Sequence, residues 1–285
     1  MKTPTVMFIG FGDLATRALP SLLEITRVIG VSRHPEHLPG SLSHGVYGDY
    51  GSLEGLAKAA EIKPDYLIFT PVPASRDVEG YQTGYAKAAE NIAGSGLLST
   101  ARRAIFVSST RVYAERSGGW VDEDSPLAVG DPFVDALLSG EACFRRHANT
   151  TVVRPSGLYD GANPIMLRPI LEGLSSRIGS GFTNRIHRDD AASVIAELIK
   201  RDFQGQWLPA TLNLNDNTPV TTGELEAWCF QELGREPAGQ RDNQPRANRR
   251  VSNAKLQALG FSLRYPSFRE GYKEALSKAL TQPGA

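Results

Sequence analysis

The chain has 285 residues, of which 41% are hydrophobic, so it can bury a sizeable core as one large domain or as a domain with a smaller lobe. Its 31 basic and 31 acidic residues cancel, which argues against a nucleic-acid or membrane partner held by bulk charge. Cys143 and Cys229 match no metal or redox spacing, and we see neither a signal-peptide pattern nor a membrane-length apolar run, so we expect a cytoplasmic protein.

The strongest local signal is a glycine turn near the N-terminus. An apolar, β-rich run, Val6–Ile9, leads to Gly10 and Gly12. Ala15 completes a Gly-x-Gly-x-x-Ala spacing, and a helical pattern starts at about Asp13. Gly10 permits a tight turn, Gly12 lets a diphosphate approach the backbone, and Ala15 lets the helix pack on the sheet. This context favours a dinucleotide site at the helix N-terminus; the alternative is a turn that binds nothing.

Strands and helices alternate through the first 155 residues. Pro20 lies inside the first helical pattern and predicts a kink or an early stop there. The alternation predicts an α/β protein with a doubly wound parallel sheet and helices on both faces. The expected strands are Val6–Ile9, Arg27–Ser32, Gly45–Tyr47, Asp65–Thr70, Ala104–Ser108 and Thr151–Arg154. The expected helices are Asp13–Leu23, Leu53–Ala60, Gly80–Leu98 and Pro132–His147.

The end of the second expected strand, at Ser32 and Arg33, bears on the choice of dinucleotide. An acidic residue here usually holds the ribose hydroxyls of NAD, whereas an arginine suits the 2′-phosphate of NADP. Arg33 has the planar fork of donors that matches phosphate oxygens, so we expect NADP(H) to be preferred, with NAD(H) possible. The alternative is that Arg33 simply lies on the surface. His34 and His37 follow without further ligands, and we expect no metal site.

Beyond Pro155 the pattern is smaller and less regular. We therefore expect a dinucleotide-binding domain over 1–155 and a smaller α/β lobe over 156–285 that is interleaved with it. Gly234–Arg250 is polar and basic, and is either a mobile loop or part of a substrate lip. The other expected elements are the strand Leu212–Leu214 and the helices Met166–Leu174, Asp189–Lys200, Thr222–Leu233, Asn253–Leu259 and Phe268–Ala279.

Six sequence motifs, in one order along the chain, resemble those of a known family. They are the N-terminal glycine turn, Asp49 after the third strand, Ser108-Ser109-Thr110-Arg111-Val112-Tyr113, Val153-Arg154-Pro155 with Gly157-Leu158-Tyr159, Ile186-His187-Arg188-Asp189-Asp190, and Ser252-Asn253-Ala254-Lys255-Leu256 with Leu259-Gly260-Phe261. The chain thus resembles the extended short-chain dehydrogenase/reductases, the NAD-dependent epimerase/dehydratase family, which have a Rossmann fold. Its glycine spacing departs from the usual Gly-x-x-Gly-x-x-Gly of that family, so it looks like an atypical branch.

The resemblance implies a set of cofactor-binding positions, and it implies that Ser109 is the catalytic Ser/Thr. The resemblance also implies a possible homodimer formed through Gly80–Leu98 and Pro132–His147. Since ligands of open α/β proteins bind in a crevice, we expect a small-molecule substrate between the domains, near Ser109, Tyr113, Arg154 and Ser156. The residues expected to line the dinucleotide are Gly10, Gly12, Asp13, Leu14, Ser32, Arg33, Asp49 and Tyr50. Those expected to follow it toward the nicotinamide are Thr70, Pro71 and Val72.

One departure from the family concerns catalysis. The resembling enzymes move a proton with a Tyr-x-x-x-Lys pair, but Phe133 and Leu137 stand at those positions here. Neither side chain can act as a general acid or base. Tyr113 is the nearest substitute in sequence to Ser109, although a packed aromatic is the commoner role for that tyrosine. Arg111 and His187 are further candidates, although a structural role is the commoner one for His187. Asp135 lies two residues after Phe133 on the same helix and should face another side. The acidic run 122–124 could bind a cationic substrate, but such a run is more often a solvated turn.

Two functions therefore remain open. The first is an NADP(H)-dependent oxidoreductase or epimerase of a small polar molecule, with displaced acid/base residues. The second is a catalytically silent NADP(H)-binding sensor or scaffold. Ser109 favours the first, Phe133 and Leu137 favour the second, and the glycine turn supports both.

Overall fold

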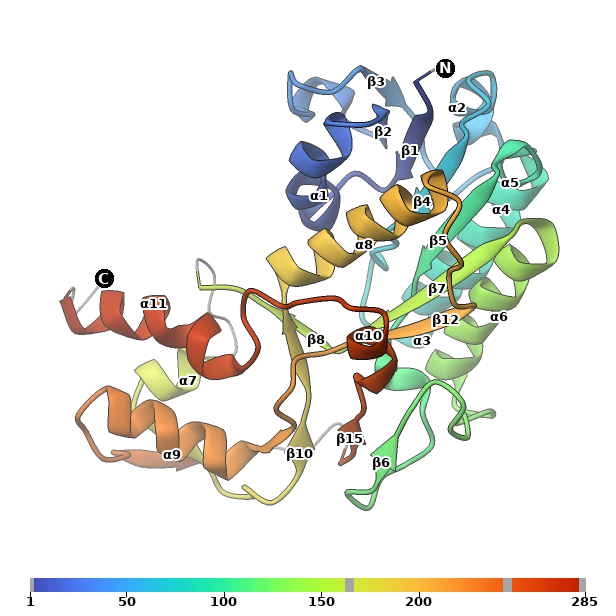
Figure 1. Ribbon diagram of the computed structural model, residues 1–285. Coiled ribbons are helices and arrows are strands. Elements are labelled where there is room, and N and C mark those ends of the chain that lie inside the picture. Colours follow the sequence, from blue (N-terminus) through green and yellow to red (C-terminus); the bar gives the residue numbers. More distant parts are fainter. Residues whose placement is uncertain (1–2, 162–166, 243–247, 282–285) are drawn as a thin grey trace. The chain divides into compact units, whose positions relative to one another are not determined.

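The computed structural model describes residues 3–161, 167–242 and 248–281 (Figure 1). The chain divides into two compact units whose segments alternate along the sequence. The first unit comprises Met1–Val112, Ala128–Arg154 and Ala192–Leu212, and the second comprises Tyr113–Leu127, Pro155–Ala191 and Asn213–Ala285. The expected single boundary at residue 155 puts residues 113–127 in the first domain and 192–212 in the second. The structure has residues 113–127 in the second unit and 192–212 in the first.

A seven-stranded sheet in the order β12-β7-β5-β4-β1-β2-β3 forms the centre of the first unit. The pairings from β3 to β7 are all parallel, and β7 hydrogen-bonds along β12 in the same direction. This confirms the predicted doubly wound parallel sheet. Its strands are β1 (Thr5–Ile9), β2 (Arg27–Ser32), β3 (His44–Tyr47), β4 (Tyr66–Phe69), β5 (Arg103–Val107), β7 (Thr150–Pro155) and β12 (Thr211–Leu214).

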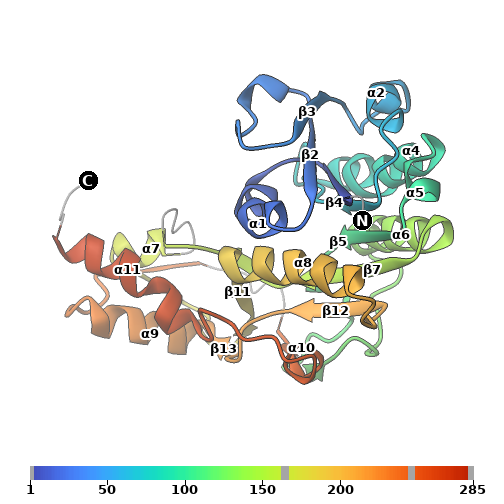
Figure 2. The same ribbon diagram turned by 45° about the horizontal axis from the view of Figure 1, so that its top comes forward.

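Helices cover both faces of this sheet, because its central strands β1, β4 and β5 are apolar at nearly every position. Every residue of β4 is buried. Figure 2 shows α1 and the 192–203 part of α8 on one face, with α4 and α6 on the other. The helical elements are α1 (Asp13–Leu23), η1 (Pro35–His37), η2 (Glu54–Leu56), α2 (Ala57–Ala60), α3 (Val78–Tyr81), the π-helix η3 (Gln82–Lys87), α4 (Ala88–Gly94), α5 (Leu97–Thr100), η4 (Thr110–Val112), α6 (Pro132–His147) and α8 (Arg188–Phe203).

Two local expectations need correction. The early stop that Pro20 could have caused does not occur, because α1 continues to Leu23 with the proline in its interior, on the exposed side. The predicted single helix Gly80–Leu98 is a continuous helical run from Val78 to Gly94, which contains the π-helix η3, followed by the separate α5. The break lies at Gly96, whose φ of 81° is left-handed and which precedes α5.

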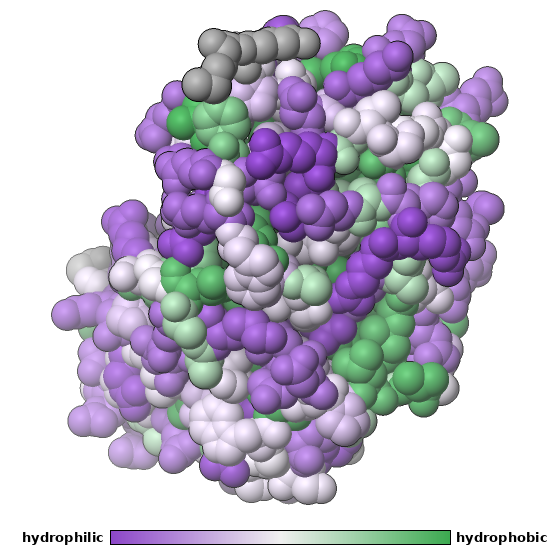
Figure 3. All heavy atoms as spheres, turned by 45° about the vertical axis from the view of Figure 1, so that its right-hand side comes forward, coloured by the Kyte–Doolittle hydropathy of each residue, from purple (hydrophilic) through white to green (hydrophobic). Residues whose placement is uncertain are grey.

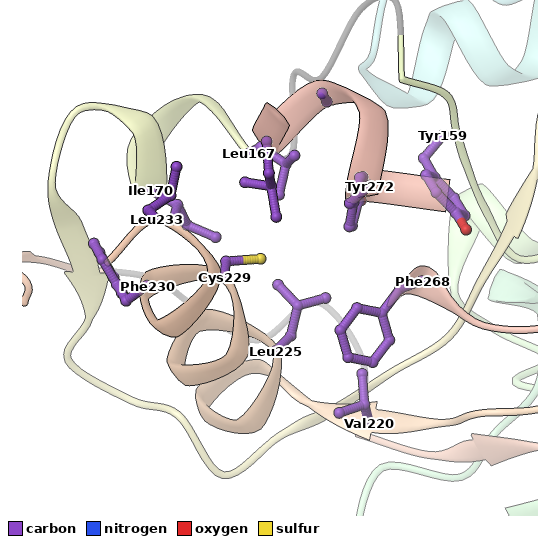
Figure 4. Close-up of a cluster of buried hydrophobic side chains, with 12 residues drawn as sticks. Tyr159, Leu167, Ile170, Val220, Leu225, Cys229, Phe230, Leu233, Phe268 and Tyr272 are labelled. Atoms are coloured by element: carbon purple, nitrogen blue, oxygen red, sulfur yellow. The ribbon is translucent and has the colours of Figure 1, made fainter. Parts of the chain in front are cut away.

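The second unit has its own apolar core, formed by twelve buried side chains that point toward one another from α9, α11 and the adjoining segments (Figure 4). Its sheets are small pairs: β8 with β11, β9 with β14 and β6 with β15 are parallel, and β10 with β13 is antiparallel. The predicted helix Met166–Leu174 begins outside the described residues, and only α7 forms beyond that point. The strands are β6 (Trp120–Val121), β8 (Gly157–Tyr159), β9 (Leu174–Ser176), β10 (Phe182–Thr183), β11 (Arg185–His187), β13 (Val220–Thr221), β14 (Gly239–Arg241) and β15 (Arg250–Val251). The helices are α7 (Arg168–Leu171), α9 (Thr222–Glu232), α10 (Ala254–Ala258) and α11 (Phe268–Thr281).

The face of the surface in Figure 3 is largely hydrophilic, with hydrophobic patches between the polar residues. Among the described residues, no helix is both long enough and apolar enough to cross a membrane.

Candidate dinucleotide site and active site

The expected dinucleotide residues Gly10 and Thr70 meet where the strand order reverses. β1 is flanked by β2 and β4, so the connections leave it in opposite directions at this point, which in open α/β sheets is where ligands bind. The Thr70 backbone N–H donates to the Ile9 carbonyl at 3.1 Å, and its hydroxyl donates to the carbonyl of Gly10. Gly10 has φ +80°, and a Cβ there would lie 2.7 Å from the Thr70 carbonyl oxygen. Only glycine fits this turn without strain.

Gly12 is the N-cap residue of α1, and its surroundings leave room for a ligand. Its N–H donates to the Gly10 carbonyl at 2.9 Å, and no side chain caps the helix. A Cβ added at Gly12 would meet no atom within 4 Å. The first N–H groups of a helix have no intrahelical partner and lie at the positive end of its dipole. Asp13 forms an exposed ion pair with Arg17 at 2.9 Å, and Leu14 is half-buried.

The end of β2 leaves an arginine in solvent. The Ser32 hydroxyl accepts a hydrogen bond from the His34 N–H at 3.0 Å, which shapes the turn. Arg33 is exposed and pairs with no carboxylate among the described residues. Its guanidinium is therefore available to a phosphate.

Sequence reasoning missed one member of a small group next to Arg33. Glu36 joins His34 and His37, and the potential metal-ligand atoms of the three residues lie within 4.8 Å of one another. All three side chains are exposed, and His34 Nδ1 already contacts Glu36 Oε1 at 3.2 Å. Cofactor titrations should therefore include a chelator, so that stray metal ions cannot affect the result.

A hydrogen bond joins the loop after β3 to the loop after β4. The Tyr50 hydroxyl donates to the Val72 carbonyl at 3.2 Å, and Asn91 Nδ2 donates to the Tyr50 carbonyl at 3.0 Å. Asp49 accepts from the Gly51 N–H at 2.8 Å, while Pro71 is half-buried and Val72 is exposed. The structure thus brings Tyr50 and Val72 together, as their shared assignment to one site requires. Nothing in the sequence pattern pointed to Asn91.

Ser109 is the second residue after β5 and is half-buried, and its hydroxyl accepts from the Arg111 N–H at 3.1 Å. The neighbouring Ser108 has a different role, because its hydroxyl donates to Glu141 Oε1 at 2.6 Å. Glu141 is also paired with Arg154, with Nη2 to Oε2 at 2.7 Å and both side chains at most 3% exposed. Arg154 is therefore committed to a buried ion pair that ties α6 to β7, and this contact does not favour the expected place beside the substrate.

Two hydrocarbon side chains, Phe133 and Leu137, stand at the positions of the family's proton-transfer pair, and an arginine packs against one of them. Leu137 is fully buried, and Phe133 is half-buried in the first turn of α6. The Arg111 guanidinium carbon lies 4.1 Å from the centroid of the Phe133 ring and 5.3 Å from that of Tyr81. Asp135 accepts from the Gly130 N–H at 3.0 Å and serves the start of the helix. This contact gives Asp135 a structural role and does not favour a catalytic one.

Tyr113, the nearest candidate substitute, belongs to the second unit and is fully buried. Its hydroxyl donates to Asn213 Oδ1 at 2.6 Å, and Arg249 Nη1 donates to its carbonyl at 2.6 Å. These contacts are those of a packed structural tyrosine, and they do not favour its predicted catalytic role. His187 is likewise buried and stacks on Tyr265, with ring centroids 3.7 Å apart.

Known structures resemble the chain along nearly its whole length. A Methylobacillus flagellatus protein assigned to the NAD-dependent epimerase/dehydratases is 27% identical, with a TM-score of 0.80 over 99% of this chain and 100% of that one. The chain has the fold of the extended short-chain dehydrogenase/reductases. This confirms the resemblance read from the six motifs.

Two further structures share this extended short-chain dehydrogenase/reductase fold at lower identity. WbmG from Bordetella bronchiseptica, solved in complex with NAD, is 14% identical with a TM-score of 0.78 over 98% of this chain and 94% of that one. The UDP-Glc/GlcNAc 4-epimerase of Campylobacter jejuni is 15% identical with a TM-score of 0.76 over 97% and 98%. No protein-family model matches the sequence, and no curated protein matches it. At these identities, the likeness to these two structures shows the fold alone.

Proposed function

We propose that the protein is an NADP(H)-dependent oxidoreductase or epimerase that acts on a small polar substrate without a Tyr-x-x-x-Lys pair. The observation that supports this most is the turn at Gly10 and Gly12, which combines an uncapped helix N-terminus with open space at the sheet's reversal point. A diphosphate fits there because backbone N–H groups and the helix dipole both favour an anion. The NAD complexes of structures with this fold agree with a nicotinamide nucleotide.

Different residues of the first unit would bind different parts of such a nucleotide. Gly12, Asp13 and Leu14 would present backbone N–H groups to the diphosphate, and Arg33 would take the 2′-phosphate. Thr70, Pro71 and Val72 would border the half that carries the nicotinamide. Ser32, Asp49 and Tyr50 would line the rest of the dinucleotide. A nicotinamide bound there supplies or accepts hydride.

The protein's own contribution to the chemistry would come from Ser109. Its hydroxyl lies at the carboxyl end of β5, which pairs with β4, the strand that leads into Thr70. From this edge it can donate a hydrogen bond to a substrate oxygen. Phe133 and Leu137 cannot move a proton, so the proton would come from solvent or from the substrate itself.

The second function is a catalytically silent NADP(H)-binding protein. Full burial of Leu137 and the packing of Phe133 against Arg111 favour it, because both positions of the usual pair are committed to packing. Such a protein would report cofactor occupancy through a partner or a change of shape.

Cofactor binding and turnover separate these functions. Calorimetric titration with NADP⁺, NADPH and NAD⁺ measures binding, and nicotinamide absorbance follows turnover across carbonyl compounds and nucleotide sugars. Turnover that Ser109→Ala reduces supports the enzyme. Binding without turnover, with Ser109→Ala changing binding alone, supports the silent protein. Failure to bind any of the three nucleotides contradicts both functions.

A further inference from the structure

An arginine clamped by two aromatic rings lies beside Ser109. Arg111 comes from η4, Phe133 from α6 and Tyr81 from α3, and all three belong to the first unit. The rings of Tyr81 and Phe133 meet edge to face, with centroids 5.1 Å apart and planes at 87°. A guanidinium over aromatic faces is attracted by their quadrupoles, so the two rings restrict where this charge can go.

The positive charge of Arg111 is not neutralised by an acidic side chain within the described part of the chain. No carboxylate there forms an ion pair with it, although its side chain is exposed. The acidic residues closest to Phe133 in sequence are engaged elsewhere. Asp131 accepts from the Phe133 N–H at 2.9 Å as the N-cap of α6, and Asp135 accepts from the Gly130 N–H. Ring stacking engages the faces of a guanidinium and leaves its N–H edges able to donate.

The position of Arg111 also relates it to the missing lysine. Leu137 stands where the resembling enzymes have a positively charged lysine, one helical turn after the position of Phe133. Arg111 supplies a positive charge against the Phe133 ring instead, two residues from Ser109. An arginine cannot give up its proton in a protein, so it can bind an anion but cannot replace the tyrosine as an acid.

We propose that Arg111 is a specificity-determining residue that binds an oxyanion, a carboxylate or a phosphate, on the substrate. This rests on the proposed function, since it names the substrate class of that same site. The planar fork of donors suits either oxyanion, and Phe133 supports the guanidinium with its ring. Substrates of this protein would accordingly be acids, and their neutral analogues would bind weakly.

The test compares an acid with its neutral counterpart. Malonate and malonamide share one skeleton, and each is titrated calorimetrically into the protein with and without saturating NADP⁺. The variants are Arg111→Leu, Arg111→Lys, which keeps the charge but not the fork, and Arg146→Leu, which removes an exposed arginine at the far end of α6. Thermal melts confirm that each variant is folded.

We expect malonate to bind with a dissociation constant on the order of millimolar, at least about tenfold tighter than malonamide. Arg111→Leu should remove that preference, Arg111→Lys should reduce it, and Arg146→Leu should keep it. Equal binding of acid and amide, equal binding by Arg111→Leu, or no malonate binding would overturn the proposal. If Arg111→Leu does not fold, the Arg111→Lys comparison decides.

Two further arms separate related outcomes. Inorganic phosphate, added to NADP⁺-loaded protein so that the diphosphate site is filled, tells whether the subsite prefers phosphate or carboxylate. If the protein ignores nicotinamide nucleotides but loses malonate binding in Arg111→Leu, the proposed function fails and the anion site stands. If it binds NADP⁺ but shows no Arg111-dependent malonate binding, only the anion site fails.

Discussion

Arg33 is the side chain on which the choice between the two nicotinamide nucleotides depends. It is exposed and unpaired within the described residues, and no acidic residue stands at the end of β2 to hold a ribose hydroxyl. We expect NADP⁺ to bind more tightly than NAD⁺, and Arg33→Ala to erase that difference. Loss of a charge-assisted phosphate contact costs about 1.5–3 kcal/mol. Calorimetric titration of both nucleotides measures the difference, and equal affinities in the unmutated protein would contradict the preference.

A buried carboxyl in the second unit should make the stability of the protein depend on pH. Burial raises the pKa of Asp216 to about 7, and the hydrogen bond from the Thr218 N–H at 3.0 Å only partly opposes the rise. Below about pH 4 the Asp216 carboxyl is protonated in both the folded and the unfolded protein. Between about pH 4 and 7 it is ionised in the unfolded protein but still protonated in the folded one, so the free energy of unfolding falls by a few kcal/mol as the pH rises. Above about pH 7 the carboxyl is ionised in both states, and its contribution no longer changes with pH.

Asp216→Asn tests this directly. The variant should lose the part of the pH dependence between pH 4 and 7 that Asp216 causes, whatever its stability at one pH. Urea unfolding at several pH values measures it. The exposed Asp124→Asn is the control and should follow the unmutated protein. A slope unchanged by Asp216→Asn would show that this carboxyl is ionised normally in the fold.

Helix α6 carries the departure from the family, and a buried ion pair fixes its position. Glu141 receives hydrogen bonds from Ser108 of the β5 loop and from Arg154 of β7. Glu141→Gln should lower the free energy of unfolding by about 3–5 kcal/mol, since it leaves the Arg154 charge buried without its partner. The exposed pair Lys87–Glu90 offers a control, because Glu90→Gln should cost under about 1 kcal/mol. Similar losses for both variants in urea unfolding would contradict the structural role of Glu141.

Element boundaries followed from sequence where one pattern dominated. The ranges Arg27–Ser32 and Pro132–His147 were predicted as the structure has them, because an apolar strand and a helix that begins with Asp131 and Pro132 have clear limits. The irregular helices between 78 and 100 were not, since the π-helical turns of η3 have no signature in hydrophobic spacing. Pro20 suggested an early end of the first helix, but α1 continues past it, and the neighbouring Leu19 and Leu22 are buried in the core.

For the whole molecule, the alternation of strands and helices predicted the doubly wound parallel sheet, whereas the strand order and the details of the site depend on long-range contacts. Gly10 and Thr70 are 60 residues apart in sequence, and the family resemblance assigned both to one dinucleotide site. The pairing of Arg154 with Glu141 and the clamp of Tyr81 on Arg111 depend on tertiary packing that no spacing encodes. The same holds for Tyr113, whose partner Asn213 lies 100 residues away.

The two glycines of the first turn allow the fold and the ligand site to be tested separately. Gly10→Ala would place a methyl group 2.7 Å from the Thr70 carbonyl in a left-handed conformation, so it should lower the melting temperature. Gly12→Ala meets no protein atom within 4 Å, so its melting temperature should stay close to that of the unmutated protein. Thermal unfolding of both variants checks this, and an equal loss in the two would contradict the open space at Gly12.

The most direct measurement is a calorimetric titration of NADP⁺ into the unmutated protein and into Gly12→Ala. We predict saturable binding to the unmutated protein, and a loss of at least about tenfold in affinity for the folded variant, whose new methyl group would stand where the diphosphate lies. An unmutated protein that binds neither NADP⁺ nor NAD⁺, or a variant that binds as well as its parent, would contradict a diphosphate held by this turn.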